Sequence, residues 1–316
     1  MKILVTGGAG FIGSNFIKTY LLQPNFQESK IYLLDSLTYA SNEDSLDRIL
    51  VDSRVEFIHG DICDSDLVDE ITKQVEIVVN FAAESHVDRS ILDPSIFVRT
   101  NILGTHNLLY HSKKNGIKKF LQVSTDEVYG SIENGSWNED FPLKPNSPYS
   151  ASKASGDLIA RSYHETFKFP VIVTRCSNNF GPNQNIEKFI PNSITNIIRG
   201  KPITLYGDGK NKRDWIHVDD HNMALCLLLT KGEGGEVYNI GSGNEYSNLN
   251  LAKLICDLMQ QPHSIIEYVQ NRLGHDFRYS VDFSKIKSVG FQPRNNFIEL
   301  LQQTIEWYKS NINWWD

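Results

Sequence analysis

A hydroxyl residue and two adjacent carboxylates follow an apolar run near the middle of the chain. Residues 124–130 read STDEVYG directly after KKFLQV, so Thr125, Asp126 and Glu127 stand at the end of a predicted buried strand. Two acidic groups with different surroundings can serve as a general acid and a general base. A solvated loop is the alternative, because Asp and Glu are usually found on the surface.

A tyrosine and a lysine stand four residues apart in the segment PYSASK. Tyr149 and Lys153 therefore share one face if this segment is helical. A cationic lysine near a tyrosine hydroxyl stabilises the phenolate, which would make the tyrosine a base near neutral pH. Taken alone, this spacing is common and usually marks a surface pair. Its place after a glycine-rich turn and after Thr125 favours a catalytic pair.

The glycine-rich turn TGGAGFIG joins the first apolar run to a helical pattern. Gly7, Gly10 and Gly13 permit a tight turn and a close approach of the backbone to a pyrophosphate, whose charge is favoured at a helix N-terminus. Asp35 ends the next run, IYLLD, where a carboxylate can accept a hydrogen bond from a ribose 2′-hydroxyl and repel a 2′-phosphate. We therefore predict a dinucleotide site that prefers NAD to NADP. A tight turn without a ligand explains neither the three glycines nor the placed acid.

The elements that position these residues alternate between short apolar runs and longer amphipathic stretches. The runs are rich in β-branched residues and hydrophobic on both sides, as parallel strands covered on both faces require. They are KILVTG, IYLLD, VEFIHGD, IVVNFAA, KFLQVST and, later, PVIVTRC. Residues 100–116 and 147–167 have helical spacing between them. This alternation predicts an α/β fold with a doubly wound parallel sheet of the Rossmann type.

The alternation breaks from about residue 176, where loops such as NNFGPNQN and YGDGKNKRDW separate shorter elements. We therefore predict two domains. Residues 1–175 form a Rossmann domain with the dinucleotide site and the catalytic residues, and residues 176–316 form a smaller, mainly substrate-binding lobe. A helix near 221–230 and the strand EVYNIG are expected to pack back on the large sheet.

Composition excludes several classes of function. With 31 Lys and Arg against 38 Asp and Glu, the formal charge of -7 argues against a general nucleic-acid binder. The chain begins on a strand pattern without a leader, and no apolar run approaches the roughly 18 residues that a membrane span needs. We therefore expect a cytoplasmic enzyme that acts on a small molecule, with no nucleic-acid or membrane partner.

A metal site is not expected. The four cysteines are widely spaced and form no Cys-x-x-Cys pair, which argues against a disulfide framework and a cysteine zinc site and fits reduced thiols. His217 and His221 are four residues apart in RDWIHVDDH, but Val218 stands where the zinc helix motif requires Glu. Loop histidines are more simply hydrogen-bonding groups.

Together, TGGAGFIG, Asp35, STDEVYG and YSASK resemble the extended short-chain dehydrogenase/reductase superfamily, which acts on nucleotide sugars. NFAAESHVDRS, NSPYSASKAS, TRCSNNFGPNQ, GDGKNKRDWIHVDDH and NRLGHDFRY narrow the resemblance to the dTDP-glucose 4,6-dehydratase family, from residue 1 to about 280. Epimerases of the superfamily lack the Asp-Glu pair, which makes it the most diagnostic feature. Phe180 and Asn183 stand where the family usually has Tyr, and Phe277 replaces a frequent Arg. These departures concern substrate contacts and leave the reaction untouched.

The resemblance implies the residues of the site. The implied catalytic residues are Thr125, Asp126, Glu127, Tyr149 and Lys153. The implied NAD contacts are Gly7, Gly10, Phe11, Ile12, Gly13, Asp35, Asp61, Ile62, Ala82, Ala83, Tyr149 and Lys153. The implied contacts of the nucleotide sugar are Ser85, His86, Thr125, Asn178, Glu187, Lys188, Arg213, Asn248, Arg272 and His275. Asp61 by its position alone has equal claims as an adenine contact and as a helix cap.

The resemblance also implies a reaction and an assembly. Tyr149 takes the proton of the C4 hydroxyl while a hydride passes to NAD, Glu127 removes the C5 proton, Asp126 protonates the departing C6 hydroxyl, and the hydride returns to C6. A homodimer is expected to form through the helices at about 100–115 and 151–168. The alternatives are a 4-epimerase, a dehydratase for another nucleotide sugar, and a non-catalytic NAD-sensing protein, which would be expected to lose the Tyr-x-x-x-Lys pair.

Overall fold

Seven parallel strands form the central sheet of the protein. The structure is a computed structural model and describes residues 1–271 and 274–315. The strand order is β10-β6-β5-β4-β1-β2-β3, and each neighbouring pair is parallel. The strands are β1 (Lys2–Thr6), β2 (Lys30–Asp35), β3 (Val55–His59), β4 (Ile77–Asn80), β5 (Lys119–Thr125), β6 (Val171–Cys176) and β10 (Val237–Ile240). The predicted doubly wound sheet of the Rossmann type is confirmed.

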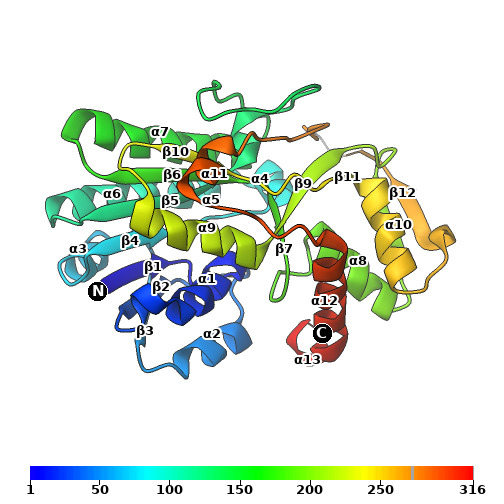
Figure 1. Ribbon diagram of the computed structural model, residues 1–316, viewed down its shortest axis with the longest axis horizontal. Coiled ribbons are helices and arrows are strands. Elements are labelled where there is room, and N and C mark those ends of the chain that lie inside the picture. Colours follow the sequence, from blue (N-terminus) through cyan, green and yellow to red (C-terminus); the bar gives the residue numbers. More distant parts are fainter. Residues whose placement is uncertain (272–273, 316) are drawn as a thin grey trace.

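The two faces of the sheet are covered because successive side chains of each strand point in opposite directions. Ile3 and Val5 of β1 pack in a core with one group of helices, whereas Leu4 packs in a second core with another group. Figure 1 shows the first group to the lower right of the sheet and the second to its upper left. The first group is α1 (Phe11–Leu22), α2 (Glu43–Leu50) and α9 (Val218–Lys231). The second group is α3 (Ser65–Thr72), α6 (Thr105–Lys114) and α7 (Pro148–Phe167).

The strand order changes direction at β1, which lies between β2 and β4. The loops that follow these strands therefore lead to opposite sides, and a crevice opens at the carboxyl ends of the strands. The glycine turn follows β1 and the STDEVYG segment follows β5, so the fold brings both motifs to this crevice.

A smaller lobe follows β6 and contains two short sheets, with strand orders β11-β9-β7 and β12-β8. Its elements are β7 (Asn178–Phe180), α8 (Phe189–Ile198), β8 (Ile203–Tyr206), β9 (Lys212–His217), β11 (Glu245–Ser247), α10 (Asn248–Leu258), β12 (Ile266–Val269), α12 (Phe297–Ser310) and α13 (Ile312–Trp315). Figure 1 shows this lobe beside the carboxyl ends of the large sheet, into which β10 returns. The boundary at 175/176 stays a prediction.

Several short helical elements complete the fold. They are η1 (Pro24–Phe26), α4 (Val87–Leu92), α5 (Ser95–Phe97), η2 (Val98–Gly104), η3 (Asp126–Tyr129), η4 (His263–Ile265) and α11 (Ser284–Val289), the last of which packs on β10. Three of them, α5, η2 and η3, contribute residues to the crevice. The helix expected over 100–116 differs in its first part, because η2 is a π-helical turn that leads into α6. Such turns are frequent at functional sites.

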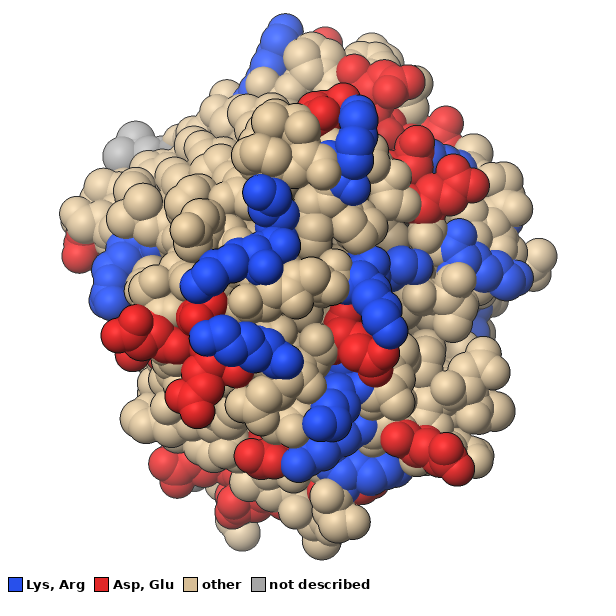
Figure 2. Space-filling view, turned by 90° about the vertical axis from the view of Figure 1, so that its left-hand side faces the viewer, with Lys and Arg blue, Asp and Glu red and all other residues tan. Residues whose placement is uncertain are grey.

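The visible surface in Figure 2 carries basic and acidic side chains in alternation. That face therefore presents no continuous basic area among the residues drawn there, although nucleic-acid binding usually relies on one. Within residues 1–271 and 274–315, none of the helices combines the length and the apolar character needed to cross a membrane.

Candidate active site

A cleft with a volume of about 430 Å³ lies at the carboxyl ends of the central strands. Every residue that the sequence assigns to NAD contact lines it, and so do all five candidate catalytic residues. The predicted residues in its wall are Gly7, Gly10, Phe11, Ile12, Gly13, Asp35, Asp61, Ile62, Ala82, Ala83, Ser85, Thr125, Asp126, Glu127, Tyr149, Lys153, Asn178 and Lys188. The fold thus brings residues that are up to about half the chain apart into one cleft.

The glycine turn places the N-terminus of α1 against the cleft. Gly7 has a φ of 68°, and a Cβ there would lie 2.6 Å from the backbone nitrogen of Ala82. A Cβ on Gly13 would collide with the carbonyl oxygen of Gly7. Within the described residues, no side chain caps α1 and no acidic residue stands in its first turn. Its N–H groups are therefore suited to an anion such as a pyrophosphate.

Asp35 joins the end of β2 to the glycine turn. Its Oδ2 accepts a hydrogen bond from the Ala9 amide and its Oδ1 accepts one from the Leu37 amide, each at 2.9 Å. Burial raises the pKa of Asp35, and these two hydrogen bonds partly offset the rise. Each carboxylate oxygen can accept a further hydrogen bond, so the residue can support its turn and still receive a ribose hydroxyl.

Asp61 lies in the cleft wall and is not the cap of the helix that follows, because the N-cap of α3 is Asp64. Its Oδ1 accepts from the Cys63 amide at 2.8 Å, and its Oδ2 lies 2.9 Å from Nη2 of Arg99. Asp61 and Arg99 both line the cleft. The residue therefore stabilises a local turn and also faces the region where the fold would receive the adenine end of a dinucleotide.

The STDEVYG segment ends β5 and forms the one-turn helix η3. The Thr125 hydroxyl oxygen accepts from the Glu127 amide at 3.3 Å and its hydroxyl donates to Oδ1 of Asp126 at 3.3 Å. Asp126 is only 1% exposed, and its Oδ2 has no hydrogen-bond partner among the described residues. The solvated-loop interpretation is therefore wrong for Asp126, whereas Glu127 is partly exposed.

The two neighbouring carboxyl groups differ in their surroundings. Burial, followed by the charge of Glu127, raises the pKa of Asp126 well above its ordinary value. A raised pKa means that the carboxyl group holds its proton more strongly, and such a group can donate its proton to a leaving group. The arrangement therefore supplies a general acid next to a second carboxyl group.

Tyr149 lies in the first turn of α7, directly behind η3. Ser147 caps this helix through a reciprocal pair of hydrogen bonds with Ser150, and Pro148 occupies the first helical position. Burial, followed by the charge of Glu127, raises the pKa of Tyr149 well above its ordinary value, while a hydrogen bond with Thr125 acts in the opposite direction.

Lys153 is buried one turn further along α7. Its Nζ donates to the carbonyl oxygen of Val123 at 2.8 Å, and burial lowers its pKa. We expected its charge to lower the pKa of Tyr149, but burial and the nearby carboxyl groups dominate that pKa. The positive end of Lys153 is directed to β5, which accounts for the difference.

The residues assigned to the nucleotide sugar divide into two groups. Ser85, Asn178 and Lys188 line the cleft, and Nζ of Lys188 donates to the Ser85 carbonyl oxygen at 2.9 Å, which links the lobe to the loop after β4. His86 and Glu187 stand next to cleft residues, with His86 Nε2 at 3.6 Å from the Glu187 carboxylate. Burial lowers the pKa of His86, so this contact is not a full ion pair near neutral pH.

Arg213, Asn248 and His275 belong to the smaller lobe and are not among the residues that line the cleft. The Arg213 guanidinium stacks 4.2 Å from the ring centre of Tyr279, and its charge acts on the pKa of Asp126. His275 Nδ1 contacts Oδ1 of Asn271 at 2.8 Å, and Asn248 begins α10. Arg272 lies outside the described residues.

One residue that sequence reasoning missed connects the parts of the site. Asn101, in the π-helical turn, accepts from the Glu84 amide at 2.9 Å and donates to the Glu84 carbonyl at 3.0 Å. It also donates to Ser152 Oγ at 2.8 Å, and Ser152 donates to the carbonyl of Tyr149. An Asn inside an apolar helical pattern was the available signal. Glu84, Arg99 and Cys176 in the cleft wall were missed as well.

The histidines considered as metal ligands have other contacts. His217 Nδ1 accepts from the Asp219 amide at 3.2 Å, and the buried His221 contacts Asn179 Oδ1 at 2.9 Å. Burial lowers the pKa of His221 to about 3, so it is neutral. Across the part of the chain that the structure describes, no group of three or more His, Cys, Asp or Glu residues is placed to hold a metal ion.

Comparison with known proteins agrees with this geometry. The family model described as GDP-mannose 4,6 dehydratase matches residues 4–304. A dTDP-glucose 4,6-dehydratase from Streptomyces niveus is 47% identical over 100% of this chain and 95% of its own length. The low-salt glycan biosynthesis protein Agl12 from Haloferax volcanii is also 47% identical, over 98% of each chain.

Solved structures show the same relationship. DesIV, a dTDP-glucose 4,6-dehydratase from Streptomyces venezuelae solved with NAD and TYD bound, is 47% identical, covers 100% of this chain and 99% of its own, and superposes with a TM-score of 0.98. A UDP-glucuronic acid 4-epimerase from Bacillus cereus, covering 98% and 99% of the two chains, has a TM-score of 0.92 at 28% identity. The family match and these full-length identities show that the chain belongs to the dTDP-glucose 4,6-dehydratase family.

Proposed function

We propose that the protein is an NAD-dependent hydro-lyase that converts dTDP-glucose to dTDP-4-keto-6-deoxyglucose. The observation that carries the proposal is the buried, hydrogen-bonded Asp126 beside Glu127 in the cleft that also contains Tyr149 and the glycine turn. Relatives of 47% to 49% identity are named dTDP-glucose 4,6-dehydratases, and the similar DesIV structure contains NAD and TYD. These likenesses support the choice of substrate and cofactor.

The cleft fits NAD in the chemistry of its wall. The N–H groups of the first turn of α1 suit the pyrophosphate, and Asp35 suits the ribose hydroxyls. When bound, NAD supplies a hydride acceptor for C4 of the sugar and a hydride donor for C6, and its nicotinamide ring adds a positive charge. That charge, together with Lys153, favours the phenolate form of Tyr149 against the effect of burial.

The residues of the chain move the protons. Tyr149 accepts the proton of the C4 hydroxyl during the oxidation, and the resulting ketone acidifies the C5 proton. Glu127 then removes that proton, and Asp126 donates its own proton to the departing C6 hydroxyl. Thr125 orients the pair through its contacts with Asp126 and with the Glu127 amide. Glu127 returns its proton to C5 when C6 receives the hydride, so NAD ends in its original oxidation state and no net cofactor turnover is expected.

The Asp126–Glu127 pair favours dehydration over the alternatives. Epimerisation at C4 requires hydride transfer and rotation of the ketone, but no acid for a departing hydroxyl. A non-catalytic NAD-binding protein would not require a buried acid next to an intact Tyr149 and Lys153. We place the nucleotide sugar against the cleft residues Ser85, Asn178 and Lys188, with His86, Glu187, Arg213, Asn248, Arg272 and His275 as further contacts supported by the family resemblance.

The proposed function is tested by incubating the protein with dTDP-, UDP- and GDP-glucose and analysing the products by mass spectrometry. We expect dTDP-glucose to give a product lighter by one water molecule, at a higher rate than the other two sugars. An isomer of unchanged mass would identify an epimerase. Binding of each sugar without any product would support the non-catalytic alternative.

Cofactor preference should depend on Asp35. Asp35→Ala removes an acceptor for a ribose hydroxyl and a charge that repels a 2′-phosphate, so NAD should bind about tenfold more weakly and its advantage over NADP should narrow. Calorimetric titration of the apoprotein with both dinucleotides measures this. Asp35→Asn is the matched variant, because it retains one acceptor for the Ala9 or Leu37 amide while losing the charge. Unchanged affinities in both variants would leave Asp35 only a structural role.

A homodimer is part of the proposal. Apolar side chains are exposed on the helices named for this contact, with Leu103, Tyr110 and Leu158 exposed by 58%, 51% and 55%. A second copy of the chain would cover them. We expect a dimer mass by analytical ultracentrifugation at micromolar concentration, and a monomer for Leu158→Glu. Leu22→Glu, at a 79% exposed site on α1, is the control that should stay dimeric. A monomeric wild-type protein would contradict this assembly.

We also propose a cytoplasmic location and a division of labour between residues 1–175 and 176–316. Burial raises the pKa of Cys176 and of Cys226 to about 12, which keeps both as unreactive thiols. All four cysteines are free, as a reducing compartment would keep them. The first segment binds NAD and carries the catalytic residues, and the second mainly binds the nucleotide sugar.

A further inference from the structure

A fully buried ion pair lies next to the catalytic residues without lining the cleft. Arg175 Nε donates to Oδ2 of Asp157 at 3.0 Å, and the two side chains are 1% and 0% exposed. Removing one partner of such a pair leaves an uncompensated charge in the interior. Because neither residue lines the cleft, any effect on the reaction has to pass through other side chains.

The arginine of this pair supports the turn that carries the acid and the base. Its Nη1 donates to the Tyr129 hydroxyl oxygen at 2.7 Å, and its guanidinium carbon lies 4.8 Å from the centre of that ring. Tyr129 is the last residue of η3, which begins with Asp126. The Tyr129 hydroxyl in turn donates to Oδ1 of Asn239 on β10 at 2.9 Å.

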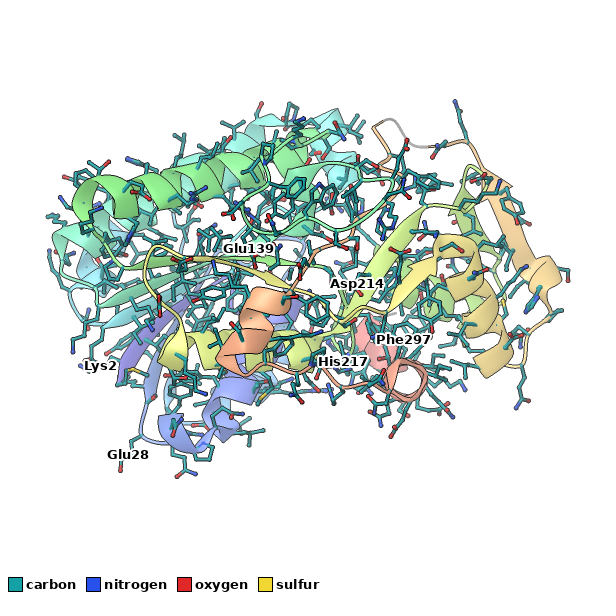
Figure 3. All side chains as sticks on the ribbon, turned by 45° about the horizontal axis from the view of Figure 1, so that its top comes forward. Lys2, Glu28, Glu139, Asp214, His217 and Phe297 are labelled. Atoms are coloured by element: carbon teal, nitrogen blue, oxygen red, sulfur yellow. The ribbon has the colours of Figure 1, made fainter. Side chains whose placement is uncertain are left out.

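The network continues from β10 to a loop that covers it. The backbone N–H of Asn239 donates to Glu139 Oε1 at 2.9 Å, and Figure 3 shows Glu139 between α7 and β10. Figure 3 also shows Asp214 and His217, which belong to β9, and Asp214 accepts a hydrogen bond from the Ser242 amide just after β10. The position of η3 is therefore coupled to Asp157 through Arg175 and Tyr129.

The aspartate of this pair also acts on the catalytic lysine. Asp157 follows Lys153 by one helical turn, so both side chains lie on one face of α7. The groups that act on Lys153 are its own burial, Asp157 and the Cys176 thiol from β6, while the Val123 carbonyl of β5 accepts its hydrogen bond. Burial raises the pKa of Asp157, and the charges of Arg175 and Lys153 act in the opposite direction. The negative charge of Asp157 thus acts on two cations, Arg175 on β6 and Lys153 on α7.

We propose that Asp157 is a positioning residue of the reaction: it holds Arg175 behind the catalytic turn and keeps Lys153 as an ammonium ion beside Tyr149. The inference rests on the proposed function, because it concerns the residues that carry the oxidation at C4. Through this one carboxylate, the acid and base on η3 and the Tyr149–Lys153 pair on α7 are held by the same interaction. Neither the motif spacing nor the cleft wall assigns such a role.

The test follows the alkaline side of the pH profile for the oxidation step. The holoenzyme is mixed with dTDP-glucose, and NADH formation in the first turnover is recorded from about pH 7 to about pH 9. In Asp157→Asn, the lost carboxylate and the unpaired Arg175 both disfavour the ammonium form of Lys153. The rate of NADH formation should therefore begin to fall at a lower pH than in the wild type. The ratio of the rate at about pH 9 to the rate at about pH 7 should decrease by about tenfold or more.

Two further variants separate this role from a general loss of packing. Asp220→Asn is the matched control, because Asp220 is also buried and accepts from an arginine, Arg294 Nε at 2.7 Å, away from the cleft. Its alkaline limb should coincide with that of the wild type. Arg175→Gln removes the cation that competes with Lys153 for the Asp157 carboxylate. The alkaline limb of the pH profile of this variant should therefore move to higher pH. The shift expected for Arg175→Gln is opposite to that of Asp157→Asn, so it tests the proposal even if Asp157→Asn does not fold.

The outcomes distinguish this inference from the proposed function. A wild-type protein that forms neither NADH nor product with any nucleotide sugar would overturn the proposed function, and the inference with it. An active wild type with unmoved alkaline limbs in Asp157→Asn and in Arg175→Gln would overturn the inference alone, even if both variants are slower. A lower rate with an unmoved limb is the signature of a merely structural ion pair.

Discussion

Replacing Asp126 by asparagine should leave the oxidation at C4 intact and slow the loss of water by about 100-fold or more. Asparagine has nearly the same shape but no acidic proton to give to the C6 hydroxyl, whereas burial raises the pKa of Asp126 and so favours its protonated form. NADH and the 4-ketone should therefore accumulate in the first turnover. Rapid-quench mass spectrometry, together with the absorbance of NADH, measures both steps.

The neighbouring residue and an exposed aspartate complete this experiment. Glu127→Gln should suppress the exchange of the C5 proton with solvent deuterium, because it removes the proposed base. Asp140→Asn, at an exposed site, should behave as wild type. Near wild-type product formation by both the Asp126 and the Glu127 variants would contradict the assignment of acid and base.

Tyr149→Phe should block the reaction one step earlier. Without the phenolic oxygen, the proposed acceptor of the C4 hydroxyl proton is missing, so we expect the formation of NADH to fall by about 1000-fold. Stopped-flow absorbance of the holoenzyme with dTDP-glucose measures this first step. Tyr163→Phe is the control, because Tyr163 lies on the same helix and packs in the core behind it. Rapid NADH formation by Tyr149→Phe would assign the first proton transfer to another residue.

The central sheet was predictable because buried parallel strands have a pattern of their own. The runs ending at Thr6, Asp35 and Thr125 are short, β-branched and apolar on both sides, and each forms a strand of the large sheet. The π-helical turn at 98–104 was not predictable, because its apolar spacing is that of an ordinary helix. The side-chain hydrogen bonds of Asn101 that accompany it join residues far apart in sequence.

Much of the candidate site was predictable for a related reason. The carboxyl ends of parallel strands meet at one edge of the sheet, so motifs that follow β1, β2 and β5 have to converge. Arg213 lies on the short strand β9 and His275 on a loop of the lobe, and only the family resemblance named them. The Asp157–Arg175 pair was hidden, because a charged residue in a helical or strand pattern is usually on the surface.

The central claim is that one hydride leaves C4 and returns to C6 of the same sugar while Tyr149, Glu127 and Asp126 move the protons. Its most direct test uses dTDP-glucose with deuterium at C4, turned over by the holoenzyme in ordinary water. We predict that the 4-keto-6-deoxy product carries the deuterium in its C6 methyl group, with no net NADH at the end. A product that retains its water and its deuterium at C4, or a dehydrated product without deuterium at C6, would contradict the mechanism.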